Sequence, residues 1–252
     1  MADTTHGLAR TILDSSDFPG WARFPDLLEA FIEERPGFSV LDIGGGANPM
    51  LSAERAAGLS YTLLDIDEAE LAKASPVYDR KVCADAGMPT DDFVACVGAG
   101  AFDLVYSHMF LEHVTDPDQV HRNIFAALRP GGFSVHAFPV NNNLPLAMNY
   151  VLPEGLSRKI LRVVQPGRDY DGNVGKFPAY YRRCYSPSSR ARRYYEQFGY
   201  RVVRHEGFAG HEYYLRFPLV RSLGQMHRRL VVAMQIPWIC FSLLVLQKPM
   251  AN

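Results

Sequence analysis

The sequence predicts an α/β protein built on a doubly wound, mostly parallel β-sheet. Apolar runs with the length of buried strands recur along the first 140 residues, and the stretches between them suit helices. The first run ends at a glycine-rich turn, and the next three end at acidic or polar residues. Parallel strands need helical crossovers, so this alternation is typical of a doubly wound sheet. The predicted strands span residues 38–43, 61–67, 82–86, 102–107 and 133–138.

The glycine-rich turn follows the first predicted strand and consists of Gly44, Gly45 and Gly46. Glycines at a strand-to-helix turn allow positive φ and let a ligand approach the main chain. Asn48 can cap a helix and Pro49 suits the first helical position, so a helix is expected from Pro49. The turn therefore predicts a ligand site, although the turn alone leaves open a glycine-rich connection without a ligand.

Acidic residues end the second and third predicted strands. Asp65 and Asp67 close the second strand about 20 residues after the glycine turn, where a ribose-binding acid is expected. Asp85 closes the third strand, and the fourth runs directly into the polar segment 107–113. Because the carboxyl ends of parallel strands meet at one edge of a sheet, these side chains are expected to lie close together.

Six ordered motifs between Val40 and Gly132 resemble those of the class I S-adenosylmethionine-dependent methyltransferases, particularly the broad small-molecule (type 11-like) subgroup. Counting the flanking strands, they cover a little over half of the chain. The resemblance implies a seven-stranded Rossmann-like methyltransferase fold with helical cap insertions, S-adenosyl-L-methionine as cofactor, and methyl transfer. The motifs are Asp-x-Gly-x-Gly at 42–46, the acid at Asp65, Asp-Ala at 85–86, Phe-Asp-Leu-Val at 102–105, Leu-Glu-His-Val at 111–114 and Leu-Arg-Pro-Gly-Gly at 128–132.

A nicotinamide-dependent dehydrogenase is the alternative that shares a glycine turn and an acid after the second strand. Such domains normally carry a third glycine where the helix packs on the sheet, and Pro49 stands there in this chain. The motifs at 102–105 and 128–132 are not dinucleotide signatures either. The sequence therefore disfavours this class.

The resemblance assigns cofactor contacts to the ends of the first four strands. Ala47 and Asn48 depart from the family's usual glycine or threonine-glycine, which should alter the shape of the turn more than its purpose. The implied roles are Asp42 orienting the glycine loop, Gly44 and Gly46 under the methionine moiety, Asp65 on the ribose hydroxyls, Ile66 on the adenine face, Asp85 on the adenine amino group with Ala86 beside it, and Ser107 near the sulfonium.

Two histidines after the fourth strand are the candidate catalytic residues. The sulfonium carries a good leaving group, so the enzyme mainly has to hold a nucleophile in line with the methyl carbon. An oxygen acceptor loses a proton as it attacks, so a base helps, and His108 and His113 have suitable positions. The Glu112–His113 pair recurs across the resembled subgroup irrespective of substrate, which indicates a structural role for His113. The chain lacks the Asp/Asn-Pro-Pro-Tyr block of nucleic-acid nitrogen methyltransferases, which favours an oxygen or carbon acceptor.

Composition is that of a single globular core with additions. A chain of 252 residues with 48% hydrophobic residues can bury one large core plus a cap. The beginning of the sequence lacks a basic region followed by an apolar run, so no secretory signal is expected. Four scattered cysteines, with neither metal-ligand spacing nor a disulfide framework, favour a cytoplasmic protein without a metal site. The oligomeric state is left open.

The domain organisation follows from the predicted sheet. Residues 1–139 are expected to form the cofactor-binding core with an N-terminal helical segment, and residues 140–185 a cap or substrate insertion. Residues 186–252 should complete the sheet, with a helix at 186–198, strands at 200–207 and 239–247, and a helical insertion at 208–237. Both insertions would emerge near the carboxyl ends of the strands, where ligands bind in such sheets.

Charge points to the partner. Residues 1–150 hold 9 Lys and Arg against 21 Asp and Glu, whereas residues 151–252 hold 17 against 6. The basic half, with arginines among tyrosines at 180–193, favours a small-molecule or glycan acceptor with anionic character, such as a sugar or a lipid-linked intermediate. An RNA methyltransferase and a non-catalytic adenosylmethionine-binding or scaffolding module are the alternatives, and nucleic acid is the less favoured partner.

The apolar segment 230–246 raises a membrane question. It is slightly short for a membrane span of about 20 residues, and Pro237 interrupts it. The sequence therefore favours the end of an amphipathic helix followed by a buried strand. A peripheral membrane contact of the helix over 216–236 stays open, because Arg221, Arg228 and Arg229 would suit anionic lipid.

Overall fold

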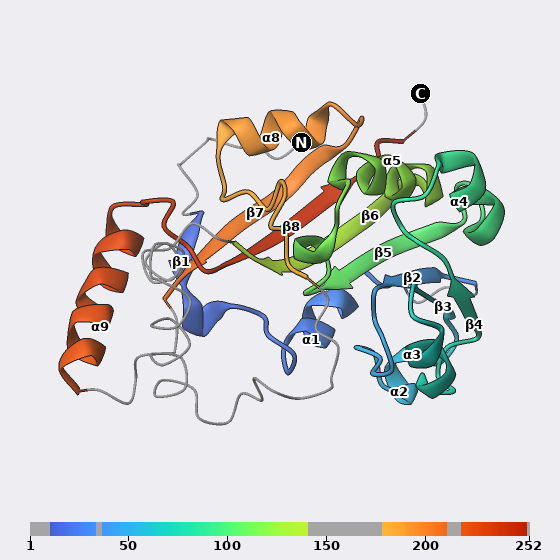
Figure 1. The fold of residues 1–252 in the computed structure, drawn as a ribbon, viewed down its shortest axis with the longest axis horizontal. Helices are drawn as coiled ribbons and strands as arrows, with labels where there is room; N and C mark the ends of the chain where they lie inside the picture. The colour runs from blue at the N-terminus through green and yellow to red at the C-terminus, as the bar shows by residue number, and fades with distance from the viewer. Residues whose placement is uncertain (1–10, 34–36, 141–177, 211–217, 251–252) are drawn as a thin grey trace.

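The computed structural model describes residues 11–33, 37–140, 178–210 and 218–250. Of the cap expected at 140–185, residues 141–177 lie outside the described part. Within the described part, one eight-stranded sheet runs through the molecule in the order β1-β7-β8-β6-β5-β2-β3-β4 (Figure 1). The strands are β1 (Ile12–Asp14), β2 (Ser39–Ile43), β3 (Ser60–Asp65), β4 (Arg80–Cys83), β5 (Phe102–His108), β6 (Leu128–Pro139), β7 (Arg201–Ala209) and β8 (Phe241–Gln247).

Strands β2 to β6 are parallel, and β8 runs antiparallel to both β6 and β7. The sheet separates two buried cores, because successive side chains on its central strands point to opposite faces. Val40 on β2 and Tyr106 on β5 belong to one core, whereas Leu41 and Val105 belong to the other. These strands are apolar on both faces, which explains their near-continuous hydrophobic sequence.

Helices cover both faces of the sheet. Their buried residues place α1, α2 and α3 in one core and α4, α5 and α8 in the other. The helices are α1 (Phe24–Glu29), α2 (Ala53–Ala56), α3 (Glu68–Lys73), α4 (Thr90–Val97), α5 (Pro117–Ala127), α8 (Ser189–Glu196) and α9 (Pro218–Ala233), with 3₁₀ turns η1 (Ser15–Asp17) and η2 (Leu111–His113).

The structure confirms the predicted α/β fold class and departs from the predictions in two details. The sheet has eight strands in place of seven, because β1 adds to the edge beside β7. The helix after the glycine turn begins at Ala53 rather than Pro49, and its cap is Ser52, whose hydroxyl accepts from Arg55 N at 3.4 Å, rather than Asn48.

The segment 230–246 contains the end of α9 and most of β8, as the sequence favoured. Among the described residues, no helix has both the length and the apolarity required to span a membrane.

The edge strand β1 is closed on its outer side by one side chain. β1 pairs in parallel with Gly207–Ala209 of β7. On the other side, the Gln235 amide oxygen accepts from Thr11 N at 2.9 Å and Ile12 N at 3.0 Å, and its nitrogen donates to Ile12 O at 2.9 Å. Arg228 of α9 forms an ion pair with Asp14 at 3.0 Å. These contacts fasten the end of α9 to the edge of the sheet.

Candidate active site

The glycine turn wraps around the carboxyl end of β2. Gly44 and Gly46 have φ of 71° and 57°, the left-handed region that favours glycine. A Cβ atom on Gly44 would collide with the Phe110 ring. Gly44 N donates to Leu64 O at 2.8 Å, and Gly46 N donates to a carboxylate oxygen of Asp65 at 3.0 Å. The turn is therefore held by the end of the neighbouring strand β3.

Asp42 lies beneath this turn and is buried. Its Oδ2 accepts from the hydroxyls of Tyr78 at 2.8 Å and Tyr106 at 2.7 Å. Burial raises the pKa of Asp42 to about 6, although both tyrosine hydrogen bonds act in the opposite direction. A Cβ atom on Gly45 would collide with this carboxylate. Asp42 thus lies directly against the turn, and its orienting role stays a prediction.

Asp65 ends β3 and is mostly buried. Besides Gly46 N, it accepts from Asp67 N at 2.9 Å through its other oxygen. Asp67 in turn caps α3 by accepting from Ala69 N at 2.8 Å. A carboxylate has about four acceptor positions, so two remain on Asp65 for a ligand after these bonds.

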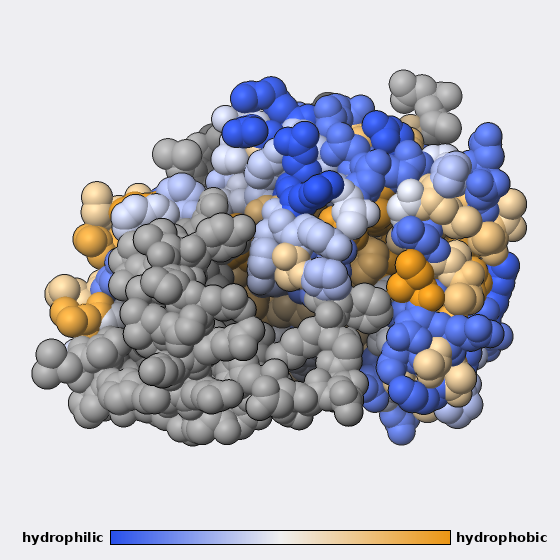
Figure 2. Space-filling model, viewed as in Figure 1, coloured by the Kyte–Doolittle hydropathy of each residue, from blue (hydrophilic) through white to orange (hydrophobic). Residues whose placement is uncertain are grey.

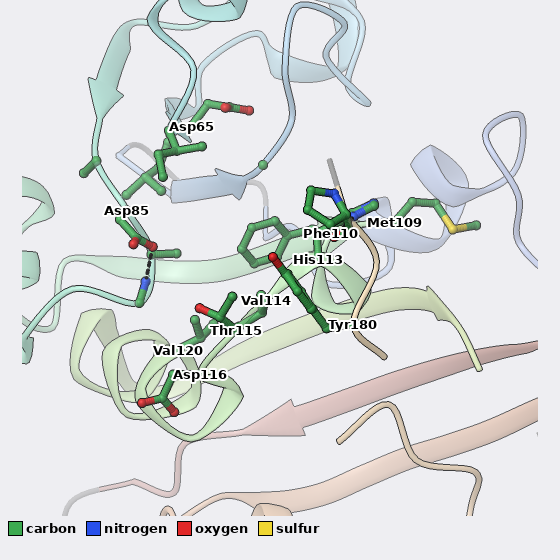
Figure 3. Close-up of a pocket in the computed structure, with 17 residues that line it drawn as sticks. Asp65, Asp85, Met109, Phe110, His113, Val114, Thr115, Asp116, Val120 and Tyr180 are labelled. Atoms are coloured by element: carbon green, nitrogen blue, oxygen red, sulfur yellow. Dashed lines mark hydrogen bonds between the residues drawn. The ribbon is translucent and has the colours of Figure 1, made fainter. Parts of the chain in front are cut away.

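A cavity of about 380 Å³ opens at the carboxyl ends of β3, β4 and β5. Figure 3 shows Asp65 and Asp85 on one side of it and Phe110, His113 and Tyr180 on the other. The volume falls within the usual range for small-molecule pockets, about 300–1,000 Å³. The apolar lining with a few acidic side chains suits a ligand that has a flat apolar part and several hydrogen-bonding groups.

The wall formed after β3 and β4 carries four of the residues predicted from the sequence. Ile66 lines the cavity with 57% of its surface exposed, which is unusual for a large apolar side chain and offers a surface for a flat ring. Asp85 is exposed and accepts from Gly87 N at 2.8 Å, the dashed line in Figure 3. Ala86 beside it is buried, and its carbonyl accepts from Asn123 of α5 at 2.8 Å. Asp65 completes this wall.

The opposite wall contains His113 and, behind it, Glu112. His113 Nδ1 lies 3.1 Å from Pro178 O, so Nδ1 is the protonated nitrogen of the neutral ring. Its Nε2 lies 3.6 Å from Glu112 Oε1. Glu112 is buried, its Oε2 has no hydrogen-bond partner within the described residues, and burial raises its pKa to about 7. The carboxyl group of Glu112 therefore lies close to the imidazole ring of His113.

A short strap, residues 178–183, closes this side of the cavity. The Tyr180 and Tyr181 amides donate to Glu112 O at 2.7 and 3.0 Å. Arg182 Nη1 donates to Thr115 O at 2.7 Å, and its guanidinium lies 5.8 Å from the centroid of the Tyr180 ring. Tyr180 and Thr115 both line the cavity. An exposed cation therefore stands at the rim.

Ser107 and His108 do not line the cavity. Ser107 is buried, and its hydroxyl bonds with Nδ1 of His136 at 2.8 Å. His108 is buried against the rings of Trp21 and Phe24, with centroid distances of 4.4 and 4.9 Å. Burial lowers its pKa to about 4, and neither ring nitrogen has a hydrogen-bond partner in the described part of the chain. The structure thus separates His108 from His113.

Sequence reasoning did not single out Phe110 or Thr115 of the cavity wall. Phe110 follows Met109, whose φ of 53° turns the chain sharply after β5, and no sequence signal marks that turn. Tyr180 was part of the predicted basic and aromatic insertion, but its place in the cavity wall depends on the strap. In the described residues, no cluster of histidine, cysteine and carboxylate side chains is suitable for a metal ion.

Comparison with known proteins identifies the class. The model of the methyltransferase-domain family matches residues 18–211, well over half of the chain. The chain therefore belongs to this family, as the ordered motifs indicated. Its sequence and fold are those of a class I S-adenosylmethionine-dependent methyltransferase domain.

A curated relative, a ubiquinone biosynthesis O-methyltransferase from Pseudomonas aeruginosa, is 36% identical over 117 residues, 45% of this chain and 50% of the relative. The chain thus spans about half the length of the curated relatives it matches. Among solved structures, phosphoethanolamine N-methyltransferase 2 of Haemonchus contortus, in complex with S-adenosyl-L-methionine, aligns with a TM-score of 0.55 at 17% identity, over 92% of this chain and 53% of that one. A methyltransferase from Methanosarcina mazei aligns with a TM-score of 0.53 at 17% identity, over 89% of this chain and 98% of that one. At these identities the structural likeness shows the fold alone.

Proposed function

We propose that this protein transfers the methyl group of S-adenosylmethionine to an oxygen of a small or medium-sized anionic acceptor, such as a sugar, a glycan or a lipid-linked biosynthetic intermediate. The proposal rests on one observation. A cavity lined by acidic residues at the strand ends has a cationic side chain, Arg182, at its rim. The O-methyltransferase relative supports an oxygen acceptor.

The residues around the cavity suit S-adenosylmethionine. Asp65 keeps two acceptor positions for the ribose hydroxyls, and charge-assisted hydrogen bonds of this kind are strong. Ile66 and Ala86 would hold the adenine, with Asp85 accepting from its amino group. The main chain at Gly44 and Gly46 would support the methionine moiety. When bound, the cofactor supplies an electrophilic methyl group.

The protein's part in the reaction is to hold the acceptor and to take its proton. We assign the base to His113, because it lines the cavity and its Nδ1 donates to Pro178 O, so that Nε2 is the basic nitrogen of the neutral ring. The proton of the acceptor hydroxyl would pass to Nε2, and the carboxylate of Glu112 would stabilise the resulting imidazolium. His108 is the second candidate, although its apolar surroundings oppose protonation.

The rim would select the acceptor. Arg182 uses one N–H group on Thr115 O and has further donors for a phosphate or carboxylate. The neighbouring Arg183 lies 3.8 Å from Asp118 and donates to the Tyr185 hydroxyl at 2.9 Å, so it is more committed to the fold. Arg182 is therefore the primary candidate for binding the anionic group.

The test is transfer of tritiated methyl groups from S-adenosylmethionine into fractionated cell extracts. Label should appear in small anionic compounds, and the product should release methanol or an O-methyl fragment characteristic of ethers and esters. S-adenosylhomocysteine should raise the melting temperature, as any ligand of the native state does, whereas NAD should not. Label confined to RNA would refute the acceptor class, and absence of a thermal shift would refute the cofactor assignment.

A further inference from the structure

Helix α9 presents a stripe of large apolar side chains to solvent. Leu223, Met226 and Leu230 of the helix are 53–64% exposed, as is Met234 in the turn that directly follows it. At 100° per residue, their spacing places all four within about 80° of the helix circumference. Trp238, which follows the helix, is 48% exposed and stacks on His227 with ring centroids 5.8 Å apart. Apolar residues of this size rarely gather on the surface of a monomer without a partner.

The stripe is held in place by the other side of the helix. Val231 is buried, and Val232 and Ile236 pack against the core. Gln235 and Arg228 bind the edge strand β1, as described above. The helix lies beyond β1, at the opposite edge of the sheet from β4 and from the cavity wall (Figure 1). In Figure 2 apolar side chains reach the surface at this end of the molecule. The exposed stripe is therefore a fixed feature of the fold.

Charge indicates what covers it. From residue 213 to residue 252 the sequence contains five Lys and Arg and no Asp or Glu. Three of the arginines, Arg221, Arg228 and Arg229, belong to α9. Arg229 is exposed and, by the helical spacing, flanks the apolar stripe. An apolar stripe flanked by an arginine, on a helix without acids, is typical of helices that lie in the interface of anionic membranes.

A second copy of the chain fits this surface less well. A twofold contact through α9 would bring the same helix of two molecules together, so Arg229 of each copy would flank the contact without carboxylates from the helix to pair with it. Trp238 also favours lipid, because tryptophan is enriched at the level of the headgroups. The helix of 16 residues, about 24 Å long, offers enough length to lie along a bilayer surface.

We propose that Leu223, Met226, Leu230, Met234 and Trp238 form a membrane-docking surface that binds peripherally to bilayers containing anionic lipid. The helix lies parallel to the bilayer, its apolar side chains enter the boundary between headgroups and acyl chains, and Arg229 contacts anionic headgroups. This binding is independent of which acceptor is methylated.

Cosedimentation of the full chain with vesicles tests the proposal. Wild type should bind vesicles of phosphatidylcholine with 30 mol% phosphatidylglycerol, and should bind pure phosphatidylcholine vesicles at least about fivefold more weakly. The M226E/L230E variant should lose at least about tenfold in partitioning, because two apolar side chains no longer enter the bilayer. Val203→Glu is the matched control, since Val203 is also an exposed apolar residue (46%) but lies on β7.

The contribution of positive charge to vesicle binding is tested by Arg229→Glu, with Arg193→Glu on α8 as its control. The first should lower partitioning about fivefold or more and the second should change it little. On a Trp21→Phe background, Trp238 is the remaining tryptophan, and its emission should shift to the blue on binding. Light scattering after gel filtration measures the oligomeric state and so tests whether a second copy of the chain covers the surface instead. A dimer that M226E/L230E dissociates, without vesicle binding by wild type, would overturn the proposal in favour of self-association. Equal binding of wild type and M226E/L230E would overturn it as well. The melting temperature of M226E/L230E shows that this variant is folded.

Discussion

Replacing Asp65 with alanine should weaken S-adenosylhomocysteine binding by a factor of about 10–150. A hydrogen bond to a charged group contributes about 1.5–3 kcal/mol, and each 1.4 kcal/mol is a factor of ten in affinity. The structure adds a second effect, because Asp65 already accepts from Gly46 N and Asp67 N. The variant therefore also releases the glycine turn. Calorimetric titration with S-adenosylhomocysteine measures the affinity.

The release of the turn should appear as a loss of stability. Two backbone donors lose a charged acceptor beside an open cavity, where water can replace part of the bond, so we expect a loss of about 2–3 kcal/mol. For a domain of this size that corresponds to about 4–12 °C in melting temperature.

Asp79→Ala is the matched control, because Asp79 likewise accepts a backbone N–H, that of Tyr61 at 2.8 Å, and does not line the cavity. It should lower the melting temperature and leave the affinity unchanged. If Asp65→Ala remained folded and bound the ligand as wild type does, the ribose assignment would be refuted.

Three further predictions concern the opposite wall and the rim. Burial raises the pKa of Glu112 from 4.5 to about 7, so its contribution to stability is full below pH 4.5 and is lost as the pH rises through about 7. The gap in melting temperature between Glu112→Gln and wild type should therefore widen in favour of the variant across this range, and parallel melting curves would contradict the argument. Arg182→Ala should raise the KM for an anionic acceptor at least about tenfold, the worth of a lost charged hydrogen bond, while the Kd of S-adenosylhomocysteine stays within about threefold. Arg193→Ala is its control, and an equal effect of both variants would exclude a specific rim contact. RNA retention on filters should be weak at physiological salt, because binding through phosphates falls steeply with salt. Tight, salt-sensitive retention that depends on Arg182 and Arg192 would instead favour the RNA alternative.

The core sheet could be predicted because its determinants are local. Apolar runs, the glycine turn and the acids at strand ends each lie within a few residues, and their order determines the fold. β1 was missed because Ile12–Asp14 is too short to show any periodicity. It is a strand only through its pairing with β7, almost 200 residues away. The helix expected from Pro49 begins at Ala53 because Ser52 supplies the capping oxygen.

The residues of the candidate site also divide into those that local sequence determines and those that the fold determines. Asp65, Ile66, Asp85 and Ala86 were predictable, because each ends a strand at the edge where ligands bind. The orientation of residues at the end of β5 was not, because β5 is buried throughout and apolarity does not show which side chain points to which face. His108 consequently stood beside His113 as a catalytic candidate, whereas the structure packs it against Trp21.

The contact between Gln235 and β1 protects the edge of the sheet from pairing with another copy of the protein. An edge strand offers a row of unpaired N–H and C=O groups, and another chain can add to it as a further strand and start aggregation. β1 extends the sheet by only three residues, and the Gln235 amide occupies the N–H and C=O of Ile12 and the N–H of the preceding Thr11. The Gln235 side chain thus takes hydrogen-bonding positions that a further strand would otherwise fill. A Gln235→Ala protein would keep its cavity and its sheet but should associate through this edge, seen as growing light scattering on storage.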